Sequence, residues 1–96
     1  MKEGKTKSID ELVNQVLRNM GLERKFKEHE VCQVWPEIVG NMISSKTTKL
    51  DLVDGVLFVS FNSAVVKNEM SMVKEGVIDA LNKRVGMEVV KEMVIR

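Results

Sequence analysis

The chain has 96 residues, of which 44% are hydrophobic and 30% charged, and its formal net charge is +1. A chain of this size forms one small domain without a deep substrate cavity, and its near-zero charge excludes a global attraction to nucleic acid or membranes. The single cysteine, Cys32, excludes an internal disulfide and fits a reducing compartment. Without a run of about 18 apolar residues or an apolar signal region, we expect a cytoplasmic protein with no membrane contact.

A polar stretch and a capped helix begin the chain. Residues 1–7 are rich in lysine, and we expect them to form a flexible basic tail that precedes a single domain from residue 8 to residue 96. Ser8 and Glu11 form an S-x-x-E capping box, which predicts a helix start at Ser8 and an end at Gly21. We expect the apolar stripe of this helix to pack against the domain; it consists of Ile9, Leu12, Val13, Val16, Leu17 and Met20.

Helical periodicity resumes from Arg24 to Ser44, but Pro36 interrupts it. Because proline lacks an N–H and disfavours α conformation in the residue before it, we expect one helix to end near Val34 and another to begin at Pro36. Gly40 would then lie inside a helix, where glycine is unfavourable. A close approach of another backbone segment to Gly40 would explain why glycine is tolerated there. We expect Trp35 in the core rather than as an exposed binding aromatic.

The stretch from Thr47 to Asn62 is predicted to form a β-hairpin. Asp54-Gly55 is a preferred pair for a type I′ turn, which pairs Val53 with Val56 and, at the far end, Thr48 with Phe61. Opposed residues share a face of the sheet. The side that needs a cover of helices carries Leu50, Leu52, Leu57, Val59 and Phe61. The other side carries Lys49, Asp51, Val53, Val56, Phe58 and Ser60.

A long helix and a last strand complete the predicted fold. Ser63 is expected to cap a helix that reaches about Val85 and ends at Gly86, with apolar residues at helical spacing: Val66, Met70, Val73, Val77 and Leu81. Residues 87–96 are predicted as a third strand. It could lie antiparallel beside the first hairpin strand or parallel beside the second, and we favour the first. The predicted fold is α+β, in the order α-α-α-β-β-α-β, with helices on one face of a three-stranded sheet.

Few residues could carry enzyme chemistry. His29 and Cys32, three residues apart on a helix, could supply two metal ligands, but a structural zinc site needs four. The sequence contains no P-loop and no G-x-G-x-x-G motif. We therefore expect a protein that is not an enzyme and that has no cofactor and no metal site.

Local groups of basic residues remain as candidates for binding. A basic face could be built from Arg24, Lys25, Lys27, Lys46 and Lys49, although the same residues could form a solvated, self-compensating surface. On the open side of the hairpin, Phe58 could stack on a base with Lys49 near the phosphate. It could equally anchor a protein interface or a dimer, or be covered by the N-terminal tail or a helix.

Several short motifs in their order and spacing resemble the DciA family. They are Trp35-Pro36-Glu37-Ile38-Val39-Gly40, Ser45-Lys46-Thr47, the Asp54-Gly55 hairpin, the Ser63-capped segment up to Met70, and Leu81-Asn82 followed by Gly86. The resemblance covers Ser8 to Arg96 and implies a KH-like fold, DNA binding, and a role in loading the bacterial replicative DNA helicase. The G-x-x-G loop with which KH domains grip nucleotides is absent. Many members also carry a flexible segment beyond the position of Arg96; if that segment recruits the helicase or DNA, this chain is expected to perform only part of that role.

Three functions therefore compete at this point. We expect a non-enzymatic accessory protein of DNA replication that binds the replicative helicase and, weakly, single-stranded DNA. The alternatives are a KH-like nucleic-acid-binding module that acts without the helicase, and a plain protein-interaction domain. The salt dependence of nucleic-acid binding separates these two alternatives, whereas co-purification with a hexameric helicase identifies the first function. The sequence does not indicate the oligomeric state.

Overall fold

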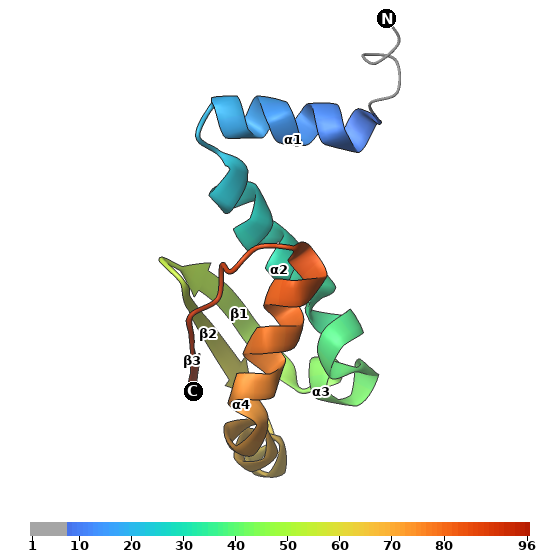
Figure 1. Cartoon of the computed structure of the whole chain (residues 1–96). Helices are drawn as coiled ribbons and strands as arrows, with labels where there is room; N and C mark the ends of the chain where they lie inside the picture. The colour runs from blue at the N-terminus through green and yellow to red at the C-terminus, as the bar shows by residue number, and fades with distance from the viewer. Residues whose placement is uncertain (1–7) are drawn as a thin grey trace, which may run out of the picture.

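The computed structural model describes residues 8–96, and its elements follow the predicted order (Figure 1). The elements are α1 (Ile9–Asn19), α2 (Glu23–Val39), α3 (Asn41–Ser45), β1 (Thr47–Val53), β2 (Val56–Phe61), α4 (Ala64–Val85) and β3 (Glu92–Ile95). Helices α2 and α4 pack on one face of a three-stranded mixed sheet, which confirms the α+β class. The predicted tail, residues 1–7, lies outside the described residues. No helix within residues 8–96 is long and apolar enough to cross a membrane.

Helix α1 forms as predicted but does not pack as predicted. The capping box is confirmed: the Glu11 N–H donates to Ser8 Oγ at 3.1 Å, and the Ser8 N–H donates to Glu11 Oε1 at 2.9 Å. Gly21, with a φ of 72°, ends the helical segment. The expected packing of the stripe is wrong, because no residue of α1 is buried and Ile9 and Met20 are 74% and 64% exposed.

The predicted break at Pro36 is also wrong, since α2 continues through it to Val39. The proline removes one helical hydrogen bond, but Trp35 is buried and its Nε1–H donates to Thr47 Oγ1 at 3.1 Å. These tertiary contacts outweigh the local cost. The helix ends instead at Gly40, whose φ of 91° favours glycine. The expected close backbone approach is wrong, because no atom beyond Gly40 and its two chain neighbours lies within 4 Å of the position that a methyl group on Gly40 would occupy.

The hairpin confirms the predicted turn and most of the predicted register. Asp54 and Gly55 both have positive φ, at 50° and 84°, as a type I′ turn requires. Pairs from Val53–Val56 to Lys49–Ser60 are as predicted, but Phe61 faces Thr47 rather than Thr48 because the register shifts there. The extra residue turns Thr47 toward the core, where its hydroxyl accepts from Trp35 and donates to the Ile43 carbonyl at 2.9 Å.

The favoured position of the third strand is wrong. Strand β3 lies parallel to β2, from Val56–Glu92 to Val59–Ile95, and the sheet order is β1-β2-β3. The strand is also shorter than predicted, because Asn82 holds the segment before it. The Asn82 Oδ1 accepts from the N–H groups of Val89 and Val90 at 3.1 and 2.9 Å, and its Nδ2 donates to the Val90 carbonyl at 2.9 Å.

Helix α4 forms one wall of the core. The Ser63 hydroxyl accepts from the Val66 N–H at 3.3 Å, as the predicted cap requires. At Val73 the backbone leaves helical geometry, with φ −118° and ψ 16°, and its side chain is 50% exposed rather than in the core. The predicted core side of the hairpin is confirmed, since its residues are buried or packed against the buried cluster. The buried cluster comprises Val31, Val34, Trp35, Leu57, Val59, Phe61, Val66, Met70, Leu81, Val85, Val89, Val90 and Met93.

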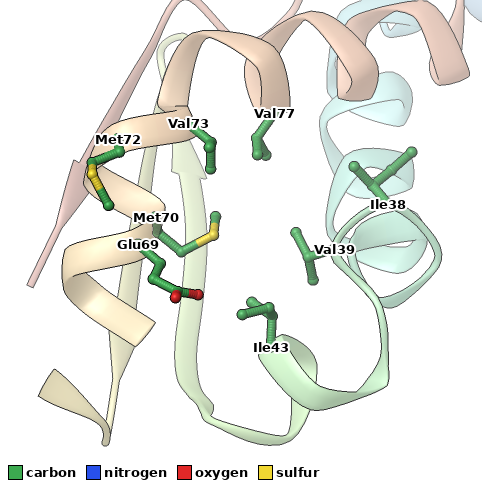
Figure 2. A pocket seen from close by; sticks show the side chains of 8 residues that line it. All are labelled: Ile38, Val39, Ile43, Glu69, Met70, Met72, Val73 and Val77. Atoms are coloured by element: carbon green, nitrogen blue, oxygen red, sulfur yellow. The ribbon is translucent and has the colours of Figure 1, made fainter. Parts of the chain in front are cut away.

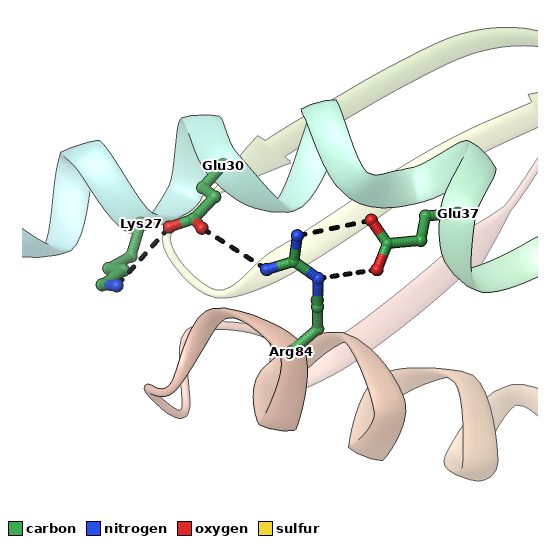
Figure 3. Close-up of polar contacts among 4 residues, drawn as sticks. All are labelled: Lys27, Glu30, Glu37 and Arg84. Atoms are coloured by element: carbon green, nitrogen blue, oxygen red, sulfur yellow. Dashed lines mark hydrogen bonds and ion pairs between the residues drawn. The ribbon is translucent and has the colours of Figure 1, made fainter.

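An ion-pair cluster ties α2 to the last turns of α4 (Figure 3). The guanidinium of Arg84 makes a bidentate contact with the carboxylate of Glu37, with Nε–Oε2 at 2.7 Å and Nη2–Oε1 at 3.3 Å. Its Nη1 lies 3.8 Å from Glu30, which also pairs with Lys27 at 3.5 Å. Because these groups are partly solvated, the cluster orients the two helices more than it stabilises them.

Candidate functional site

The side of the sheet that faces away from α2 and α4 (Figure 1) carries the predicted site residue Phe58, because Phe58 alternates along β2 with the buried Leu57 and Val59. We call this side the open face. The register places Phe58 between Asp51 on β1 and Val94 on β3. Its side chain is half-buried, whereas the neighbouring Val53 is 53% exposed. The open face consists of Lys49, Asp51, Val53, Val56, Phe58, Ser60, Glu92 and Val94.

The guanidinium of Arg96 lies over the ring of Phe58, and this contact was not predicted from the sequence. The Cζ atom of Arg96 lies 4.5 Å from the ring centroid, in a cation–π contact. The Arg96 N–H donates to the Val59 carbonyl at 2.8 Å and so fixes the backbone beside β2. Arg96 follows Val94 by two residues, so a correct placement of β3 would have put it on this face. Neither α2 nor α4 covers the ring.

Charge is unevenly distributed along the sheet. Strand β1 begins at the end where β2 and the parallel β3 finish, so Lys46, Lys49 and Arg96 lie at one end of the sheet. The opposite end carries Asp54 in the turn and Glu92 at the start of β3. The first end is therefore basic, whereas the turn end is mixed in charge, because the Lys91 side chain lies against Gly55 there.

The other predicted basic residues lie elsewhere. Arg24 and Lys25 line a shallow hollow with Asp54 at the hairpin turn. That is the far end of β1 from Lys46, roughly 23 Å away for seven residues of strand. The partly buried Lys27 lies 3.5 Å from Glu30 in the ion-pair cluster. The structure thus brings Lys46, Lys49 and Phe58 to one region and separates Arg24, Lys25 and Lys27 from it.

The one cysteine and the one histidine do not form a reactive pair. Burial raises the pKa of the Cys32 thiol, and the nearby carboxylates of Asp51 and Glu28 raise it further, so the thiol stays protonated near neutral pH. His29 is exposed on the same helix. Within residues 8–96, no three His, Cys, Asp or Glu side chains are grouped so that they could hold a metal ion.

A second surface is an apolar groove between the α2–α3 corner and α4 (Figure 2). It has a volume of about 400 Å³ and one acidic residue, Glu69, among its lining side chains. The apolar lining residues are Ile38, Val39, Ile43, Met70, Met72, Val73 and Val77. This groove was not predicted from the sequence, because helical periodicity placed Val73 in the core. Two consecutive apolar residues, Met72 and Val73, were the available signal that α4 also has an exposed apolar side.

A comparison with known families agrees with the motifs in the sequence. The family described as "Dna[CI] antecedent, DciA" matches residues 8–95, which is nearly the whole chain. The resemblance that the sequence shows is confirmed by this match. No curated protein matches the chain.

Proposed function

The chain belongs to the DciA family, and on that premise we propose that it contacts single-stranded DNA through the open face. Family membership implies a role in loading the replicative helicase and an interaction with a helicase of the DnaB type. DciA is a non-catalytic loading factor. Weak DNA contact would let such a factor bring strand and helicase together without competing with the helicase for the strand.

One observation carries the proposal: a half-buried aromatic ring, with the Arg96 guanidinium over it, lies beside the basic end of the sheet. A base stacks on Phe58 in the position that the Arg96 guanidinium occupies, and the released guanidinium pairs with a phosphate. Lys49 and Lys46 lie at the same end and bind neighbouring phosphates. Stacking accepts every base, so this contact has little sequence preference.

The proposed contact is weak and depends on salt. Three cations at the basic end give a slope of about −2 for log affinity against log salt on a single strand. Asp51 and Glu92 on the same face repel phosphates and limit the affinity further. Arg24 and Lys25, at the far end of β1, are proposed as secondary contacts for a longer strand. Lys27, paired with Glu30, is the least available of the predicted residues.

The test is fluorescence anisotropy of labelled single-stranded oligonucleotides of several sequences, titrated at several salt concentrations. Lys49→Glu should weaken binding to all sequences alike and should reduce the salt slope by about 0.7 for the lost contact. Lys83→Glu is the matched control, because Lys83 is an exposed lysine on α4 that lies away from the open face. Loss of binding to only some sequences, or equal effects of the two variants, would contradict the proposal.

A second candidate is that Phe58 anchors the helicase itself. The apolar neighbours Val53, Val56 and Val94 favour it, because apolar residues around an aromatic ring are typical of protein interfaces. The substitution Phe58→Ala distinguishes DNA stacking on the ring from helicase binding. If DNA stacks on the ring, the change weakens single-strand binding by about 1–3 kcal/mol and spares co-purification with the helicase. If the helicase binds there, the change abolishes co-purification and spares DNA binding.

A further inference from the structure

Helix α1 is an amphipathic helix that contacts the first part of α2 but has no buried residue. Its exposed apolar residues lie on one side, which we call the α1 stripe: Ile9, Leu12, Val13, Val16 and Met20. Asn14 and Arg18 lie on the opposite side. An isolated helix of 11 residues is only marginally stable in water, and most helices in proteins are held by packing of their apolar side. A complete capping box on such a helix indicates a segment that is ordered for contact with another surface.

The apolar groove between the α2–α3 corner and α4 is the complementary surface on the same chain (Figure 2). It opens where α4 departs from helical geometry at Val73. Met72, beside it, is 72% exposed, and Val73 is half-exposed. A groove lined by aliphatic side chains and methionines is the kind of surface that accepts the apolar side of a helix.

The α1 stripe cannot reach the groove of its own chain. The turn at Gly21 ties α1 to the start of α2, whereas the groove begins at Ile38, about 22 Å further along α2 at 1.5 Å per residue. Helix α1 itself is only about 16 Å long. Folded back along α2, it would stop short of the groove, and Figure 1 shows it at the end of α2 that lies far from α3.

We propose that two copies of this chain exchange their first helices, so that the α1 stripe of each fills the groove of the other. A two-fold arrangement uses the same stripe and the same groove twice and closes as a dimer. The stripe exposes on the order of 500 Å² and the groove a few hundred Å² more, so the two contacts together bury roughly 1,500 Å² or more, the size of a stable interface. This dimer leaves the open face of the sheet accessible.

The first test is the mass of the full chain in solution, measured by light scattering and sedimentation over a range of concentrations. The unchanged chain should have twice the mass of one chain and dissociate on dilution. Val16→Glu places a charge at the centre of the stripe and should raise the dimer dissociation constant by more than about 100-fold, because the carboxylate would be buried without a partner. Gln15→Glu adds the same charge on the opposite, exposed side of α1 and should leave the mass unchanged.

The second test changes the groove. Met72→Glu should produce a monomer, whereas Ser71→Glu on the outer side of α4 should not. Both substituted side chains are exposed in one chain, so circular dichroism should show that the fold is intact.

Mixing the two monomeric variants gives the decisive result. The Met72→Glu chain keeps an intact stripe and the Val16→Glu chain keeps an intact groove, so one of the two contacts can form between them. The mixture should therefore contain a heterodimer that neither variant forms alone. Dimers that survive Val16→Glu, or a mixture that stays monomeric, would contradict the exchange. A chain that is monomeric at all concentrations overturns it and leaves the stripe to a different partner, such as the helicase.

Discussion

At the residue scale, the two phenylalanines of β2 lie on opposite sides of the sheet and should respond differently to truncation. Phe61 is buried, with its ring centroid 6.5 Å from that of Trp35, so Phe61→Ala should cost roughly 3 kcal/mol or more through the cavity it leaves. Phe58 lies on the open face under Arg96, so Phe58→Ala should cost at most about 1 kcal/mol. Urea unfolding followed by circular dichroism measures both. A Phe58→Ala chain that is unfolded would contradict the assignment of the open face.

Glu37 should make part of the stability depend on pH. The hydrogen bonds and charge of Arg84 hold the pKa of Glu37 below its usual range in the folded chain. A carboxyl whose folded pKa is lowered stabilises the fold above its unfolded pKa, and this contribution is lost as the pH falls through the folded pKa. The wild-type chain should therefore lose more stability than Glu37→Gln between neutral and acidic pH. The measurement is the urea midpoint at several pH values, with Glu75→Gln on the exposed side of α4 as control. Equal behaviour of the two variants would show that the contact is not formed in solution.

Residues on the sheet show what could be predicted from alternation alone. The Asp54-Gly55 turn set the register, and the register correctly assigned Phe61 to the core and Phe58 to the open face. Arg96 was missed because its place depends on which strand β3 joins, and alternation within one strand carries no information about its neighbours. The basic set was predicted as a group because sequence gives the charges but not the end of β1 beside which the start of α2 lies.

At the element scale, two glycines on helices should respond to alanine with opposite signs. Gly40, between α2 and α3, has φ 91° and ψ 165°, a conformation that other residues rarely adopt, so Gly40→Ala should destabilise the chain by about 1–3 kcal/mol. Gly76 lies inside α4, and an added methyl group would meet no atom within 4 Å apart from its chain neighbours and the nearby backbone of the helix, so Gly76→Ala should stabilise the chain by about 0.5–1 kcal/mol. Thermal and urea unfolding measure both. A loss of stability on Gly76→Ala would indicate that the bend near Val73 needs a flexible neighbour.

The Asn82 side chain should control the path into β3. It makes three hydrogen bonds to the backbone of Val89 and Val90, both buried, so Asn82→Ala leaves three backbone groups without these partners. At about 0.5–1.5 kcal/mol for each bond, we expect a loss of roughly 2–4 kcal/mol. Asn82→Asp keeps the acceptor and loses the donor, so its stability should lie between that of the unchanged chain and that of Asn82→Ala. Amide hydrogen exchange should show faster exchange at Val89 and Val90. Unchanged exchange in Asn82→Ala would contradict this role.

Elements with local signals were predicted, and elements decided by distant contacts were not. Ser8 with Glu11, the Asp54-Gly55 turn and Ser63 each fix their own segment, and all three were correct. The helix through Pro36 was missed, because the buried Trp35 and its bond to Thr47 come from other elements. The order of the sheet was missed for the same reason, since it depends on the pairing of β3 with β2, which lies far from it in the sequence.

At the scale of the whole molecule, the two candidate surfaces are separate. The open face lies on the side of the sheet without helices, whereas the groove lies between α4 and the α2–α3 corner (Figures 1 and 2). DNA contact and self-association are therefore independent properties, and failure of one proposal leaves the other intact. The sequence predicted the stripe of α1 but placed it against its own domain, because amphipathicity shows that a helix needs an apolar partner and not which chain supplies it.

The last prediction follows from the position of α1 outside the core. Within residues 8–96, every residue of the buried cluster lies in α2 or beyond it. Removal of residues 1–20 should therefore leave the free energy of unfolding of the remaining monomer within about 1 kcal/mol of that of the full-length monomer, because α1 contributes no buried side chain.

The measurement is urea unfolding followed by the fluorescence of Trp35, the only tryptophan in the sequence, at concentrations low enough for the full chain to be monomeric. The full chain should gain apparent stability as its concentration rises, since association stabilises the folded state, and the shortened chain should not. Val16→Glu serves as the full-length control and should behave like the shortened chain at every concentration. A large loss of stability on truncation at high dilution would show that α1 packs against its own domain, as the sequence alone had suggested.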